Sequence, residues 1–145
     1  MSQQNEALVR RMFDEAWSRG NLDVVDDCVA TDAVEYDPAE TLRGPQGQKD
    51  MITRYRTAFP DCRLEILEML STGDRVVTRF RYSGTQRGQL GPIAPTNRQV
   101  SGEGIVIHRC EKGRIVEGHS QWDQLGMLQQ LGVVTLPGQT RAAGA

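Results

Sequence analysis

The sequence has few of the residues that mark several large classes of protein. Its 145 residues include three cysteines, at positions 28, 62 and 110, and none belongs to a CxxC pair. Neither a disulfide framework nor a zinc site is therefore predicted, and buried free thiols are expected. The two histidines belong to no HExxH motif or facial triad. We therefore expect no metal.

Long apolar runs and basic runs are missing as well. No stretch approaches the roughly 18 apolar residues of a membrane span, and the N-terminus MSQQNEALVRRMF does not resemble a signal peptide. The net charge is -2, with both signs interspersed, which gives no basic field for nucleic-acid phosphates. GxSxG, Rossmann and Walker motifs are absent. We expect a cytoplasmic protein with no membrane partner, no nucleic-acid partner and no cofactor.

The composition itself is that of one globular domain. Hydrophobic residues make up 38% of the chain and charged residues 25%. A chain of this length can build one core but hardly two. We predict a single domain over residues 1–136 and a flexible tail over residues 137–145.

Helical spacing of apolar residues predicts three helices in the N-terminal part of the chain. In residues 5–19 the apolar stripe falls at i, i+3, i+4 and i+7, as Val9, Met12, Phe13 and Ala16. A second helix is predicted over residues 21–30. A third begins at Gly44-Pro45, because proline suits the first turn, and ends before Pro60.

From Arg63 onward the apolar period changes to about two, which is typical of strands. Strands are predicted over residues 63–71, 76–82, 99–110 and 114–123, with a short extended piece at 33–36 and a Gly- and Pro-rich loop at 84–98. The fold class is therefore α+β, with three N-terminal helices packed on a curved, mostly antiparallel sheet. Such a layer over a curved sheet tends to leave a pocket at its open end.

Six short motifs, taken as an ordered set, carry a resemblance to a known family. They are FPD at 59–61, GDRVV at 73–77, GTQRG at 84–88, APT at 94–96, GRIVE at 113–117 and WDQLGMLQQLG at 122–132. Together they resemble the SnoaL-like polyketide and ester cyclases of the nuclear-transport-factor-2-like superfamily. The resemblance implies a cone-shaped α+β barrel, often a homodimer through the sheet, whose apolar cavity takes a hydrophobic, oxygenated small molecule.

The same resemblance singles out Asp123 as the acid/base group of an intramolecular aldol closure of an anthraquinone-type ester. An apolar cavity raises the pKa of a carboxyl group, which can then remove a proton from carbon without a cofactor. The alternative is that Asp123 caps a helical turn that begins at Gln124.

Two further groups are candidates for proton transfer. If the last strand is regular, His119 shares a face with Asp123 and lies in the cavity, where it can shuttle a proton. Its alternative place is the outer face of the sheet. Asp37, which precedes Pro38, matches an asparagine of the cyclases and can bind a substrate hydroxyl or simply form a turn.

The strand over residues 99–110 departs from the family's pattern. The cyclases carry a glutamine and a histidine there that hold carbonyl oxygens of the substrate, whereas this chain has Gly104 and Val106. Neither side chain can donate a hydrogen bond. His108 lies on the same face and is the candidate replacement. Glu103 and Arg109 lie on the opposite face, which suits solvent or a dimer contact.

Aromatic side chains are the candidates for a wall against a planar ligand, although an ordinary core uses the same residues. The predicted substrate-binding set is Trp17, Tyr36, Tyr55, Phe59, Tyr82, Val106, His108, Gln121 and Trp122. The predicted function is a cofactor-independent cyclase, isomerase or epoxide-opening enzyme. A non-catalytic ligand-binding or dimerisation domain and a cofactor-free hydroxylase are the alternatives.

Overall fold

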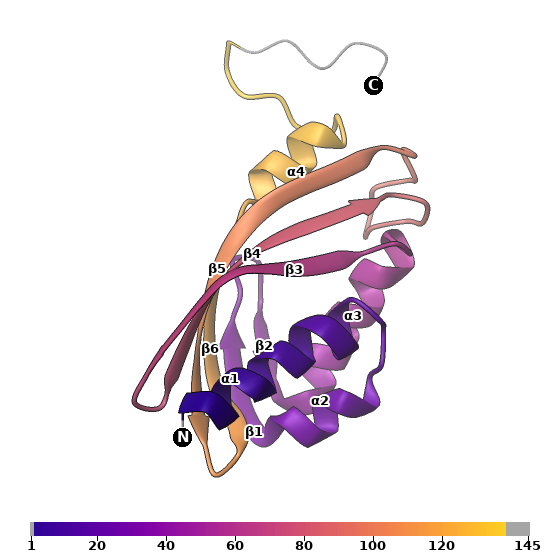
Figure 1. Cartoon of the computed structure of the whole chain (residues 1–145). Coiled ribbons are helices and arrows are strands. Elements are labelled where there is room, and N and C mark those ends of the chain that lie inside the picture. Colours follow the sequence, from indigo (N-terminus) through magenta and orange to yellow (C-terminus); the bar gives the residue numbers. More distant parts are fainter. Residues whose placement is uncertain (1, 139–145) are drawn as a thin grey trace.

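Helices cover one face of a six-stranded, strongly curved sheet in the computed structural model, which describes residues 2–138 (Figure 1). The strands are β1 (Val29–Tyr36), β2 (Thr41–Arg43), β3 (Arg63–Thr72), β4 (Arg75–Thr85), β5 (Gln99–Glu111) and β6 (Arg114–Trp122). Their order across the sheet is β2-β1-β6-β5-β4-β3. Every neighbouring pair is antiparallel except β1 and β6, which run parallel.

The helices are α1 (Ser2–Arg11), the π-helical η1 (Met12–Trp17), α2 (Asp23–Cys28), α3 (Gly44–Ala58) and α4 (Gln124–Gln130). α1 continues directly into η1, so the predicted helix over residues 5–19 is a single rod with two kinds of turn. The α+β class, the three N-terminal helical segments and the long antiparallel strands are confirmed. The short strand β2 was not predicted.

One side of the π-helical segment η1 faces the sheet. The amide of Ser18 donates to the carbonyl of Phe13, five residues earlier, at 3.0 Å, which is the hydrogen-bond pattern of a π-helix. Phe13 and Ala16 are buried, and Trp17 lies partly buried at the end of the segment. The end of this helix therefore supplies one wall of the interior.

Alternation along β5 decides which side chains face the helices. Val106, His108 and Cys110 are buried, whereas Ile105 and Ile107 are exposed on the outer face. The outer face also carries Glu103, which pairs with Arg79 and Arg81, and Arg109, which pairs with Glu111 and Glu117. The prediction that Glu103 and Arg109 lie opposite Val106 is confirmed.

Two groups of buried side chains fill the space between helices and sheet. One gathers under α1 and α2, and the other lies near α4 and the end of α3. Trp17, Leu64 and Trp122 contact both groups. Cys28, Cys62 and Cys110 are buried free thiols, as predicted.

The loop after β4 is anchored by a residue for which the sequence indicated no role. Gln86 is fully buried, donates to the carbonyls of Gly88 and Ile93, and accepts from the amide and hydroxyl of Thr96. These bonds fold the loop back on itself.

The predicted flexible tail covers residues 137–145. Of these, residues 139–145 lie outside the described part of the chain.

Candidate active site

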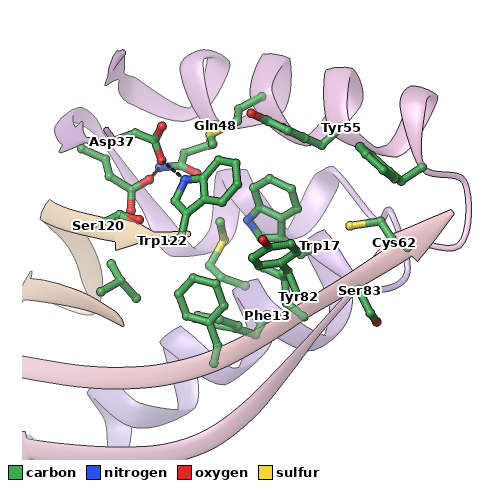
Figure 2. Close-up of a pocket in the computed structure, with 18 of the residues that line it drawn as sticks. Phe13, Trp17, Asp37, Gln48, Tyr55, Cys62, Tyr82, Ser83, Ser120 and Trp122 are labelled. Carbon is green, nitrogen blue, oxygen red and sulfur yellow. Dashed lines mark hydrogen bonds between the residues drawn. The ribbon is translucent and has the colours of Figure 1, made fainter. Parts of the chain in front are cut away.

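A cavity of about 120 Å³ lies between the helix layer and the sheet (Figure 2). Its wall is mostly apolar, and its polar side chains come from four strands, α3 and the residue after β1. They are Glu35, Asp37, Gln48, Tyr55, Tyr82, Ser83, His108 and Ser120. Small-molecule sites commonly measure about 300–1,000 Å³. The enclosed space therefore suits only part of a polycyclic ligand unless wall side chains move.

Aromatic rings occupy much of the interior near the end of the sheet. The rings of Trp17 and Tyr55 are 6.3 Å apart, and Trp122 packs edge-on against Tyr55 at 5.9 Å and Tyr82 at 5.5 Å. These four rings, labelled in Figure 2, line the cavity. Phe59 lines it too, so five of the aromatic residues predicted for the wall lie in the cavity lining. Because these rings contact one another, a planar ligand can enter among them only if they separate.

A largely buried pair of a carboxylate and an imidazole lies in the wall of the cavity. His108 Nε2 lies 3.4 Å from Glu35 Oε1, and the two side chains are only 10% and 15% exposed. Gln48, on α3, donates to Glu35 Oε2 at 2.5 Å. Burial acts to raise the pKa of Glu35, but its bonds to His108 and Gln48 outweigh this and the pKa is lowered. The carboxylate is thus held in its charged form.

The second ring nitrogen of His108 is unpaired. Nδ1 is buried and has no hydrogen-bond partner within residues 2–138. A buried polar atom without a partner costs about 1–3 kcal/mol, so such an atom commonly indicates a missing ligand or water. His108 thus lines the cavity with one ring nitrogen that no protein group satisfies.

Asp37 lies at the end of β1, two residues after Glu35. Its Oδ1 accepts from Trp122 Nε1 at 3.0 Å, the bond drawn in Figure 2, and its Oδ2 accepts from the amide of Ala39 at 3.3 Å. Burial raises the pKa of Asp37 despite the opposing effect of these two bonds. Asp37 therefore has both a turn-forming contact and a place in the cavity wall.

The two tyrosines of the cavity differ in what their hydroxyls do. Tyr82 donates to the carbonyl of Asp123 at 2.7 Å, whereas the Tyr55 hydroxyl has no hydrogen-bond partner in the described chain. Burial raises the pKa of both phenols to about 12. Tyr55 consequently stays protonated at neutral pH and presents an unused donor.

The structure also gives a physical reason for the departure at Gly104. A Cβ atom there would lie 2.6 Å from Phe80 Cζ and 2.6 Å from Trp122 Cβ. The two aromatic side chains thus occupy the space that a longer residue would need. Val106 lines the cavity as predicted, and His108 lies on the same face two residues further along.

His119 and Gln121 were predicted to face the cavity, and this is wrong. His119 is exposed on the outer face, where its ring stacks on Tyr36 at 5.0 Å and its Nε2 lies 2.7 Å from Glu117 Oε2. Gln121 and Tyr36 are exposed too, and neither lines the cavity. The predicted alternation was right but its direction was reversed.

The prediction was reversed because it included Asp123 in the last strand and directed that side chain into the cavity. β6 ends at Trp122, and Asp123 instead caps α4, with Oδ1 accepting from the amide of Gly126 at 2.8 Å. Its side chain is exposed and does not line the cavity. The inner face of β6 is formed by Gly118, Ser120 and Trp122.

Sequence reasoning missed Glu35, Gln48 and Ser120. A signal for Glu35 was present, because side chains two apart on a strand project to the same side and Asp37 was already a candidate. Gln48 gave no such signal, since its role depends on how α3 packs against β1.

Within residues 2–138, no cluster of three or more His, Cys, Asp or Glu could hold a metal ion, and no helix is long and apolar enough to span a membrane.

The helix layer and the curved sheet that enclose this apolar cavity form the cone-shaped α+β fold of nuclear-transport-factor-2-like domains. Residues 7–131 match the profile of the SnoaL-like polyketide cyclases. The chain belongs to this family, as its motifs predicted.

Relatives of known activity agree with this placement. The chain is 34% identical to the aklanonic acid methyl ester cyclase DnrD of Streptomyces peucetius, over 86% of this chain and 88% of that protein. It is 32% identical to the nogalonic acid methyl ester cyclase of Streptomyces nogalater, over 81% and 90%. TsrD from Streptomyces laurentii superimposes with a TM-score of 0.82 at 26% identity, covering 91% of this chain and 97% of that one. These similarities support an enzyme of the cyclase type.

Proposed function

We propose that this protein is a cofactor-independent cyclase that closes a ring in the methyl ester of a polyketide acid. The observation that carries the proposal is the buried imidazole of His108, which lines the cavity with one ring nitrogen unpaired. The activity of the two methyl ester cyclases that resemble the chain supplies the substrate class.

The proposed reaction begins with proton removal from carbon. His108 Nδ1 takes a proton from a carbon flanked by carbonyl groups, and the electron pair of that C–H bond forms an enolate. The enolate carbon attacks a ketone of the same molecule, a C–C bond forms, and the ketone π electrons move to oxygen. Tyr55 donates its hydroxyl proton to this oxygen, and the imidazolium returns a proton to the phenolate through solvent. Product and substrate are isomers.

The environment of each group supports this division of roles. A general base needs an unprotonated nitrogen that makes no other hydrogen bond, and His108 Nδ1 is unpaired. A donor that stays protonated stabilises the developing oxyanion, and Tyr55, with a pKa of about 12, meets that requirement. Asp37, with its raised pKa and its place in the wall, stays a predicted proton carrier.

Asp123→Asn is expected to retain turnover within a few-fold of the wild-type rate. The reason is that Asp123 is exposed and caps α4, and asparagine caps a helix as well as aspartate. Asp123→Ala should instead lower the free energy of unfolding by about 1 kcal/mol. Steady-state kinetics and thermal unfolding of the two variants separate the effects. An inactive but stably folded Asn variant would return the acid/base role to Asp123.

The function is tested by incubating the protein with aklanonic acid methyl ester and following the product by chromatography and mass spectrometry. Ring closure by aldol chemistry leaves the mass unchanged, whereas hydroxylation adds one oxygen atom. Binding is followed in parallel by tryptophan fluorescence, because both tryptophans of the chain line the cavity. Quenching without any new product would favour a non-catalytic ligand-binding domain, and a heavier product would favour a hydroxylase.

A homodimer through the outer face of the sheet is part of the proposal. Ile105 and Ile107 are 48% and 39% exposed there, side by side with the charged residues of β4 and β5. The two isoleucines lie two residues apart on the same face of β5, and a small apolar patch with charged neighbours suits a self-complementary contact. Light scattering should give twice the mass of the chain, and Ile107→Glu should give the monomer mass. A wild-type monomer at all concentrations would contradict the proposed dimer.

We also propose a cytoplasmic location, because the three free thiols suit a reducing compartment.

A further inference from the structure

A glycine of the strand β6 lies between Glu35 and His108. The two residues lie on β1 and β5, which are separated by β6. Neighbouring strands are about 4.8 Å apart, so two strands with one between them are nearly 10 Å apart, and their side chains meet only across the middle strand. At this level the residue of β6 is Gly118, which is in register with both Glu35 and His108.

Gly118 leaves the gap that the pair requires. A Cβ atom at this position would lie 2.9 Å from Glu35 Oε1, 3.0 Å from Cγ and 3.2 Å from Cδ. The φ angle of Gly118 is not in the left-handed region, so the backbone itself does not demand glycine there. The absence of a side chain is explained by the space that the Glu35 carboxylate occupies.

The Glu35 carboxylate is also fixed from its other side. Gln48 donates to Oε2, which leaves Oε1 directed at His108 Nε2. A carboxylate only accepts hydrogen bonds, so the ring nitrogen that faces it must carry the proton. In a neutral imidazole the other nitrogen then has a lone pair, and here that nitrogen is the unpaired, buried Nδ1.

We propose that Glu35 is a positioning residue, which acts across the Gly118 gap to fix the Nε2–H tautomer of His108 and thereby makes Nδ1 the proton acceptor for the ligand. The inference rests on the proposed function only for the step that His108 performs. The tautomer itself is a property of the unliganded protein. An orienting carboxylate of this kind contributes up to about 10⁴-fold to kcat in a Ser-His-Asp triad.

The test is 15N NMR of the histidine rings in the whole chain, recorded as the pH is raised until the spectra show the neutral rings. The chain has two histidines, so His119, exposed on the outer face, serves as an internal reference in every spectrum. In the wild type His108 should show one tautomer, with Nε2 protonated and Nδ1 unprotonated. His119, whose Nε2 faces Glu117 Oε2 at 2.7 Å on the outer face, should give a pattern that does not depend on Glu35.

Two variants remove the positioning in different ways. Gly118→Ala places a methyl group against the carboxylate without changing Glu35 or His108, and Glu35→Leu removes the carboxylate while keeping an apolar side chain that can be buried. Both are expected to give a mixture of His108 tautomers, unchanged His119 signals and a loss of at least tenfold in kcat/KM. Glu35→Leu decides the matter if Gly118→Ala does not fold.

The proposal is overturned if the wild type has Nδ1 protonated, or if folded Gly118→Ala or Glu35→Leu keeps the wild-type His108 pattern. A wild-type protein that shows the expected tautomer but cyclises no ester supports the positioning by Glu35 and refutes the proposed function. The two ideas therefore fail by different measurements.

Discussion

His108→Gln is expected to lower kcat/KM for cyclisation by about 10²–10⁴-fold, the range that a general base contributes. Glutamine places an amide nitrogen close to the position of His108 Nε2, so the Glu35 carboxylate keeps a donor and the buried charge stays compensated. What is lost is the titratable nitrogen. Steady-state kinetics with the methyl ester measure the effect, and circular dichroism and thermal unfolding establish that the variant folds.

The matched control is His119→Gln, the same substitution at the only other histidine of the sequence. His119 is exposed on the outer face of the sheet, so its loss should leave kcat/KM unchanged. Equal losses in the two variants would contradict the assignment of the base. Full activity in His108→Gln would remove His108 from the mechanism.

Tyr55→Phe is expected to lower kcat by about 10²–10³-fold with a smaller change in KM. Removal of one donor to a developing oxyanion has an effect of this size because the bond strengthens in the transition state. Stability should change little, since the Tyr55 hydroxyl has no hydrogen-bond partner in the described chain. The ring, which packs against Trp17 and Trp122, is retained.

The control for Tyr55 is again the same substitution elsewhere. Tyr36→Phe removes a hydroxyl from an exposed ring outside the cavity and should leave kcat unchanged. A rise in KM with unchanged kcat in Tyr55→Phe would mean that the hydroxyl binds the ground state as well as the transition state. That outcome would contradict its role as the oxyanion donor.

Most of the fold could be predicted from the sequence because its elements have strong local signals. Both patterns join residues only two to four positions apart: the helical stripe of Val9, Met12 and Phe13, and the alternation after Arg63. The π-helical turn of η1 and the three-residue strand β2 could not be predicted in this way. The first differs from an α-helix by one residue in the spacing of its hydrogen bonds, and the second exists only through its pairing with β1.

The site was harder to predict because it depends on strands that are distant in sequence. Asp37, His108 and Trp122 were found from local patterns and from resemblance, and they line the cavity. Glu35 and Gln48 become meaningful only when β1, β5 and α3 come together. His119 was misplaced because a single residue, Asp123, was assigned to a strand that ends before it, and such an error reverses every side chain on the strand.

The order of the strands also determines when activity can arise during synthesis. β6 is the last strand to be made, yet it is inserted between β1, near the start of the chain, and β5. Pairings between segments so far apart in sequence form late, because loop-closure entropy opposes them. A nascent chain that has reached β5 can form the β3-β4-β5 meander but keeps Glu35 and His108 on separate edges. Completion of the sheet and acquisition of catalytic competence are thus one event on the folding pathway.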